Sequence, residues 1–297
     1  MSQRLALAAC LIAVLVAATP ASAQDAVNVP WERALAPAPS GTEVQPRPVK
    51  NCRRGELACV ERVEDRLRAQ WRRLDRACDH RAIAALAYLR ITELLRADLA
   101  RRKPRFFADK RWMAFVITDF SNAYFEAFAR YERGLPIAES WRQFYDVATK
   151  GEATAVQELL LFSNAHAQHD LPFSYAANGV RAPDGTSHKP DHDGVNEINV
   201  RVIPRVKKEI EQRYDPNFRD VPGPLDEMAG LEPTKSWREG AWRNAERLQP
   251  AGSAAEREAS AAQIESSSAA WGRMISGPRF PGMRARRDAH CRAFHAA

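Results

Sequence analysis

Apolar residues recur at intervals of three and four along most of the chain, which is the spacing of one face of an α-helix. No glycine or proline occurs from Glu56 to Lys103, and this run predicts two helices that break near Asp79. Further helices are expected over residues 108–133, 141–147, 152–169, 193–214, 237–248, 254–274 and 281–294. Because no alternating strand pattern and no internal repeat occurs, we predict an all-α fold, a single multi-helix bundle domain over residues 56–297.

The first residues have the pattern of a targeting segment. Arg4 supplies a positive charge, residues 5–18 are almost wholly apolar, and Ala21-Ser22-Ala23 is a small-residue cleavage site. We therefore expect residues 1–23 to be a signal peptide and the mature protein to be periplasmic or secreted. Residues 24–55 are rich in proline and poor in apolar periodicity, which is typical of an extended arm.

The charge of the chain favours anionic partners weakly. The formal net charge is +7, and removal of a leader that contains Arg4 and no acid leaves the mature chain slightly less basic. This value is compatible with contact to an anionic envelope surface, or with no more than a solvated arginine-rich surface, and it is not a nucleic-acid signature. After the leader, no run approaches the roughly 20 apolar residues that span a bilayer, so no transmembrane segment is expected.

Four cysteines remain after the leader, and in an exported chain an even number predicts two disulfides. Cys59 and Cys78 lie at opposite ends of one predicted helix, about 28 Å apart at 1.5 Å per residue, whereas disulfide Cα atoms lie within about 7 Å. We therefore favour Cys52–Cys59, at the entry to the first helix, and Cys78–Cys291, which ties the C-terminal segment to the bundle.

Histidines and a carboxylate stand at the end of an apolar helix, where burial is costly unless something pairs with them. His166 and Asp170 are four residues apart and project from one helical face, with His169 to the side. Imidazole and carboxylate on one rigid helix form half of a metal site that suits zinc best, and also manganese or iron.

The other ligands are expected from a segment downstream. Asp191, His192 and Asp193 crowd together before the next helix, which carries Asn196. A short connection returns that helix antiparallel to the first, so the two polar segments are expected to meet. Asn164 and Asp119 are supporting polar residues, since Asp119 interrupts an apolar helical face.

Two hypotheses follow. In the first, the protein is an exported metal-dependent hydrolase of esters or phosphoesters, with the metal activating water. In the second, it is a non-catalytic helical protein of the envelope or the secreted fraction, whose His/Asp cluster is a structural hydrogen-bond network. No complete catalytic motif decides between them.

The stretch Asn164-Ala165-His166-x-x-x-Asp170-Leu171-Pro172 resembles a family of helical bacterial proteins known as domain of unknown function 5995. The element Asp191-His192-Asp193-Gly194-Val195-Asn196 is similar to a second motif of that family, and Asp119-Phe120 and Trp141-x-x-Phe144 are similar to its aromatic helices. The resemblance spans roughly Trp112 to Val206. It implies an all-α fold with a shared polar centre, and no established activity. The His-x-x-x-Asp spacing is also similar to that of zinc-dependent phospholipase C and single-strand nuclease enzymes.

Overall fold

The computed structural model describes residues 31, 35, 49–219, 224–249 and 253–297. The predicted signal peptide and most of the predicted arm therefore lie outside the described residues. Trp31 is described, and its indole Nε1 donates a hydrogen bond of 3.0 Å to Glu232. This contact ties one point of the arm to the helical domain.

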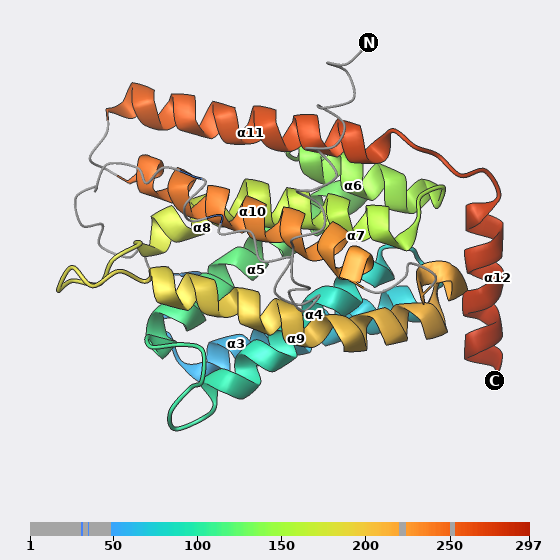
Figure 1. Cartoon of the computed structure of the whole chain (residues 1–297), viewed down its shortest axis with the longest axis horizontal. Helices are drawn as coiled ribbons and strands as arrows, with labels where there is room; N and C mark the ends of the chain where they lie inside the picture. The colour runs from blue at the N-terminus through green and yellow to red at the C-terminus, as the bar shows by residue number, and fades with distance from the viewer. Residues whose placement is uncertain (1–30, 32–34, 36–48, 220–223, 250–252) are drawn as a thin grey trace, which may run out of the picture.

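The described chain is helical, as the periodicity predicts, and it contains no strand (Figure 1). The elements are α3 (Leu57–Arg76), α4 (Ala82–Leu99), α5 (Lys110–Glu132), α6 (Glu139–Lys150), α7 (Ala155–Ser163), the π-helix η2 (Asn164–Asp170), α8 (Leu171–Asn178), α9 (Lys189–Arg213), the 3₁₀ turn η3 (Pro216–Arg219), α10 (Pro224–Leu248), α11 (Ala254–Ser276) and α12 (Met283–Ala296). In the described ranges, none of these helices combines the length and the apolar character that crossing a membrane requires.

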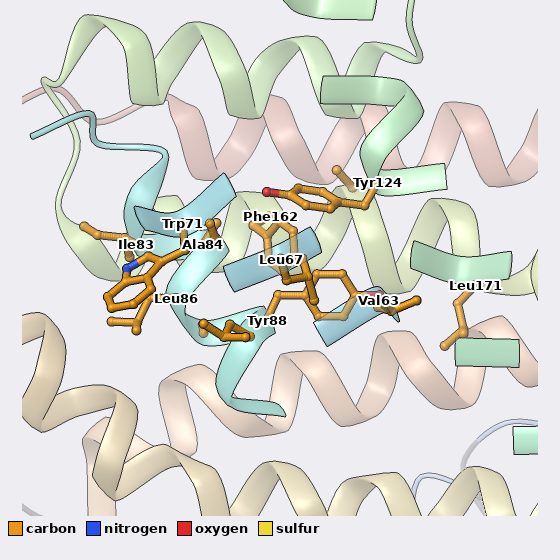
Figure 2. Packing of buried hydrophobic residues seen from close by; sticks show 14 of the residues in the cluster. Val63, Leu67, Trp71, Ile83, Ala84, Leu86, Tyr88, Tyr124, Phe162 and Leu171 are labelled. Carbon is orange, nitrogen blue, oxygen red and sulfur yellow. The ribbon is translucent and has the colours of Figure 1, made fainter. Parts of the chain in front are cut away.

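The core is aromatic where the central helices meet. Tyr88 of α4, Tyr124 of α5 and Phe162 of α7 are all buried, and their ring centroids lie 5.5 to 5.9 Å apart. Figure 2 shows these rings beside the aliphatic residues of α3 and α4. Burial of such large rings is the main stabilising contribution of this region. The packed rings also hold in place the helices that carry the polar centre.

The predicted end of the central helix near Pro172 is wrong. The helix continues from α7 through the π-helix η2 into α8, and it ends only at Asn178. Proline has no backbone N–H, and its ring collides with the carbonyl four residues earlier in an α-helix. The wider i→i+5 turn before Pro172 accommodates this ring, and the N–H of Leu171 bonds to the carbonyl of His166.

The next helix also begins earlier than predicted. Residue 193 was the expected start, but α9 begins at Lys189, with Pro190 in its first turn. Asp191, His192 and Asp193 are consequently held on a helix and not on a loop. Their side chains therefore point in different directions around its axis.

Both predicted disulfides are present. Cys52–Cys59 joins the loop before α3 to the first turn of that helix, and Cys78–Cys291 joins the turn after α3 to α12. Helix α12 stands across the ends of the other helices (Figure 1). A buried ion pair reinforces its attachment, because Arg287 donates to both carboxylate oxygens of Glu158, at 2.8 and 3.0 Å.

The two disulfides should contribute unequally to stability. They join residues 7 and 213 positions apart, and the chain-entropy model assigns about 2 kcal/mol to the first loop and about 5 kcal/mol to the second. We expect Cys78→Ser with Cys291→Ser to lower the free energy of unfolding by about 3 kcal/mol more than Cys52→Ser with Cys59→Ser. Urea denaturation of the two double variants measures this difference. Equal losses of free energy in the two double variants would contradict the larger contribution expected of Cys78–Cys291.

Candidate functional site

The buried carboxylate of Asp170 receives hydrogen bonds from three side chains. One oxygen, Oδ2, accepts from Trp141 Nε1 at 3.0 Å and lies 3.2 Å from His166 Nδ1. The other, Oδ1, lies 2.7 Å from His169 Nδ1. The π-helix places both histidines on the same carboxylate, and Trp141 reaches it from α6.

This network fixes the charge of each partner. Burial would raise the pKa of Asp170, but the hydrogen bonds from His166 and His169 hold it below its ordinary value. Burial lowers the pKa of His166. At neutral pH Asp170 is therefore an anion and His166 a neutral imidazole. Since the carboxylate can only accept, the proton of His166 is on Nδ1 and its Nε2 carries a lone pair.

His169 is the charged member of the network. Burial would lower the pKa of His169, but hydrogen bonds to Asp170 and Glu265 raise it to about 9. Its Nε2 lies 2.7 Å from Glu265 of α11, and Glu265 also accepts from the backbone N–H of Glu139. The resulting carboxylate–imidazolium–carboxylate chain joins α6, η2 and α11. Asn164 adds a hydrogen bond of 2.8 Å to the carbonyl of Ser268.

The unprotonated nitrogen of His166 has no hydrogen-bond partner among the described residues, although the side chain is only 3% exposed. The imidazole stacks on Phe120 with a centroid distance of 3.4 Å and an interplanar angle of 2°. Tyr88 meets it edge-on at 4.9 Å. The ring is thus held rigidly by Asp170 on one side and by aromatic rings on its faces.

His166 lines a partly open pocket of about 90 Å³, which we call the His166 cavity. A second hollow of about 160 Å³ adjoins it, since both are lined by Ile91, Phe162, Ser163, Asn199 and Thr234. The walls are mainly aliphatic and aromatic side chains from α4, α5, α7, α9 and α10. Among their polar groups, the hydroxyls of Ser163 and Thr234 lie 3.0 Å apart in the wall that the two hollows share. Asn199 Oδ1 is buried with no partner in the described structure, Arg238 lines the smaller hollow and Lys207 the larger one.

A second polar cluster lies on α9 and α10. His192 is fully buried, and its Nε2 lies 3.8 Å from Asp193 and 3.9 Å from Glu239. The Nζ of Lys189 lies 2.5 Å from Asp193 Oδ1 and 2.8 Å from Glu239 Oε2. The lysine ammonium therefore takes the cation position between the two carboxylates. Burial and then Arg238, Lys189 and Arg243 hold the pKa of His192 well below its ordinary value, so the ring is neutral.

The remaining predicted site residues have structural partners. Asp191 accepts from the backbone N–H groups of Ala108 and Asp109, and so fastens the segment before α5. Asn196 accepts from Arg238 Nε at 2.8 Å. Asp119 accepts from Asn178 at 3.4 Å.

The structure thus places the six predicted metal ligands in two clusters and not around one point. His166, His169 and Asp170 share one network, and His192 and Asp193 belong to the other, while Asp191 binds backbone. Within the described residues no hydrogen bond or ion pair joins the two. The reason is that α8 follows η2 without a turn, so the start of α9 packs beside Tyr175 of α8, whose hydroxyl lies 2.8 Å from His192 Nδ1.

Two groups of side chains in the described structure lie close enough to hold a metal ion, and one of them has its ligand atoms available. The ligand atoms of His192, Asp193 and Glu239 lie within 4.8 Å of one another. Cys78, Cys291 and His295 also approach one another, but both sulfur atoms are used in the disulfide.

Several residues of these clusters were not predicted. Trp141 was predicted to lie on an aromatic helix, but nothing in the sequence indicates that its indole N–H binds a carboxylate. Glu265, Arg238 and Glu239 are supplied by α10 and α11, which are distant in sequence and only weakly amphipathic. Nothing in the sequence distinguishes these charged residues from the many solvated ones around them.

The fold and the network define an all-helical protein with a buried His/Asp centre. A family model described as a family of unknown function, DUF5995, matches residues 60–278, and the chain belongs to this family. Comparison with curated proteins and with solved structures gave no match. The family assignment confirms the resemblance seen in the motifs and carries no activity with it.

The His169 network should make stability depend on pH. The pKa of His169 rises on folding, so its contribution is complete below the unfolded pKa of about 6.5 and is lost as the pH rises towards 9. We expect His169→Gln to lower the melting temperature by roughly 3–6 °C at pH 6, a gap that closes by about pH 9.5. Thermal denaturation monitored by circular dichroism measures this gap.

Ser267→Ala is the matched control, because it removes the neutral hydrogen bond of 2.9 Å from Gln168 to the same helix. Its effect on the melting temperature should not vary over this pH range. If the difference in melting temperature between His169→Gln and the native protein were also independent of pH, His169 would not be the group that carries the proton.

Proposed function

We propose that this protein binds a small, largely apolar molecule with one hydrogen-bond donor in the His166 cavity. The observation that carries the proposal is the buried His166 Nε2, an unpaired acceptor at the wall of an apolar hollow. A few polar groups among apolar walls are the usual composition of a small-molecule site.

The dimensions suit a molecule of the size of one aromatic ring. An engineered apolar cavity of about 150 Å³ in another protein binds benzene. The hollow that adjoins the His166 cavity has a volume of about 160 Å³. A ring in this space could direct a hydroxyl or an N–H group towards His166, whose imidazole is held in position before any ligand arrives.

The same geometry supports proton transfer. A neutral imidazole whose Nδ1–H is bound by a carboxylate is the arrangement in which histidine acts as a general base through Nε2. Arg238 borders the cavity, and its positive charge could stabilise negative charge on a bound oxygen. The reaction class that this site favours is hydrolysis of an apolar ester by water. His166 Nε2 would take a proton from the water molecule as its oxygen attacks the ester carbonyl, and would return that proton to the alcohol that leaves. No metal is required at Asp170, whose oxygens are already taken by three donors.

The binding proposal can be tested with a pair of isosteric probes. Phenol donates a hydrogen bond and toluene does not, so phenol should bind the protein about tenfold more tightly, the equivalent of one hydrogen bond of roughly 1–1.5 kcal/mol. His166→Phe keeps a planar ring against Phe120 and removes the acceptor, and it should abolish this preference. Isothermal titration calorimetry of both probes with both proteins measures the affinities.

Circular dichroism and the melting temperature of the variant show whether it is folded. If neither probe binds the native protein, and His166→Phe only lowers its stability, the cluster is the structural network of the second sequence hypothesis. Equal affinities for phenol and toluene would contradict the role of Nε2.

We also propose a second candidate, a divalent metal, zinc by its ligand set, at His192, Asp193 and Glu239. The buried Nε2 of His192 has no partner in the described structure and faces both carboxylates, and a neutral imidazole with two carboxylates is a zinc ligand set. The positive charges of Lys189 and Arg243 oppose a metal at this position, since Arg243 lies 2.8 Å from Glu239. Metal binding here requires the lysine ammonium to leave.

Substitution of the lysine tests this second candidate. Lys189→Met keeps the aliphatic stem and removes the competing charge, so zinc should bind the variant at least about tenfold more tightly than the native protein. Equilibrium dialysis followed by elemental analysis gives the bound zinc. His192→Phe in the Lys189→Met background should remove this binding, and retention of zinc there would locate the metal elsewhere.

We propose that the protein acts outside the cytoplasm. The two disulfides support this, because such bonds persist in oxidising compartments. The signal peptide that would direct export lies outside the described residues and remains a prediction.

A further inference from the structure

A third hollow lies on the opposite side of α5 from the His166 cavity and has a different chemistry. It measures about 610 Å³ and is bordered by the loop before α3, the first turns of α3 and the middle of α5. We call this hollow the arginine groove, because its lining includes Arg53, Arg54, Arg62 and Arg66, together with Glu56 and Phe125. It shares no lining residue with the His166 cavity.

The arginine groove is strongly positive. Four arginines line it, and Glu56 is the one acid among the described lining residues, 3.9 Å from Arg54. Glu61 and Asp65 belong to α3 but do not line the groove. Asp119 of α5 accepts a hydrogen bond from Asn178, which is not a groove residue. Low local screening in a concave site strengthens the attraction of such a surface for anions.

The groove is also preorganised. The Cys52–Cys59 disulfide closes the loop onto α3, and Arg62 Nη2 donates to the carbonyl of Asn51 at 2.9 Å. Gly55 has a φ of +66°, and a Cβ there would lie 2.5 Å from Arg111, so only glycine fits this turn. The guanidinium of Arg66 is held 3.8 Å above the ring of Phe125. Groups that are already ordered lose less entropy when a ligand binds.

The start of α3 adds to the positive potential. Its N-cap residue, Glu56, makes no side-chain capping bond, and the first turn contains no acid. The helix therefore presents the positive end of its dipole, equivalent to about half a unit charge, with Glu56 at the N-cap as the one acid of the groove beside it.

We propose that the arginine groove binds an oligoanion that carries two or more phosphate groups. Arg62 and Arg66 stand one turn apart on α3, a separation of about 6 Å, and Arg53 and Arg54 approach from the loop. Guanidinium forks match phosphate oxygens in bidentate pairs, and the groove is much larger than one phosphate requires. The same chemistry could come from a soluble polyphosphate compound or from the headgroups of phosphate-bearing lipids.

Binding of tripolyphosphate to the full chain tests the proposal. We expect a measurable affinity at low salt that falls as the ionic strength rises, because exposed charges are screened. Arg53→Gln with Arg66→Gln should weaken binding at least about tenfold, while both changes leave the Arg62 contact to the loop intact. Arg72→Gln is the matched control, since Arg72 is exposed on α3 outside the groove and should change the affinity less than about twofold.

A second arm distinguishes the two sources of phosphate. Sedimentation with vesicles of phosphatidylglycerol, against vesicles of phosphatidylcholine, shows whether headgroups serve as the ligand, and the same double variant should lose that binding. Failure of both tripolyphosphate and phosphatidylglycerol to bind the native protein would overturn the proposal. An equal loss in Arg72→Gln would overturn it too, as would equal affinity for the tricarboxylate citrate. None of these results bears on phenol binding at His166.

Discussion

The polar centre depends on one buried anion, the carboxylate of Asp170. An isolated buried charge is very costly, and here three donors offset that cost from two different elements. Trp141 binds the carboxylate from α6, while His166 and His169 bind it from the π-helix. Because Asp170 is ionised, it determines which nitrogen of His166 holds the proton, and His169 can keep a positive charge that reaches Glu265 on α11. The packing of three elements and the acceptor in the cavity thus follow from the same group.

The contacts of the polar centre to the two histidines are local in the chain. His166 and Asp170 are four residues apart, a spacing at which side chains meet on one helical face, and His169 is the direct neighbour of Asp170. Within the π-helix, the two imidazoles contact opposite oxygens of this one carboxylate. π-Helical turns cost stability and are often found at functional sites. Pro172, whose ring the widened turn accommodates, lies two residues after Asp170.

The extent to which sequence predicted structure follows from the range of the interactions involved. Helix periodicity is local, so the all-α class and most helix positions could be read from apolar spacing, and helix length was enough to exclude a Cys59–Cys78 bond. The π turn could not be predicted from the sequence, because a single proline in an otherwise regular apolar pattern is its one signal. The expectation that the next helix returns antiparallel and brings Asp191 to Asp170 was wrong for the same reason. The proline was taken as the end of the helix, so α8 was not predicted. Glu265, Arg238 and Lys189 act through tertiary contacts, and their roles depend on where distant helices lie.

The two proposed ligand sites differ because the protein distributes its charge unevenly. In the interior each of these charges has a partner of opposite sign: His169 stands between two carboxylates, Arg287 pairs with Glu158, and Lys189 with Glu239. A buried charge without such a partner would be very costly. The excess of positive charge in the chain must then reside largely on exposed side chains, and in the arginine groove four of them meet a single acid. An apolar, uncharged ligand suits the His166 cavity, and a multiply charged anion suits the arginine groove. The cavity excludes the anion because the anion would lose its hydration there. The groove binds the apolar ligand weakly because it offers little apolar contact.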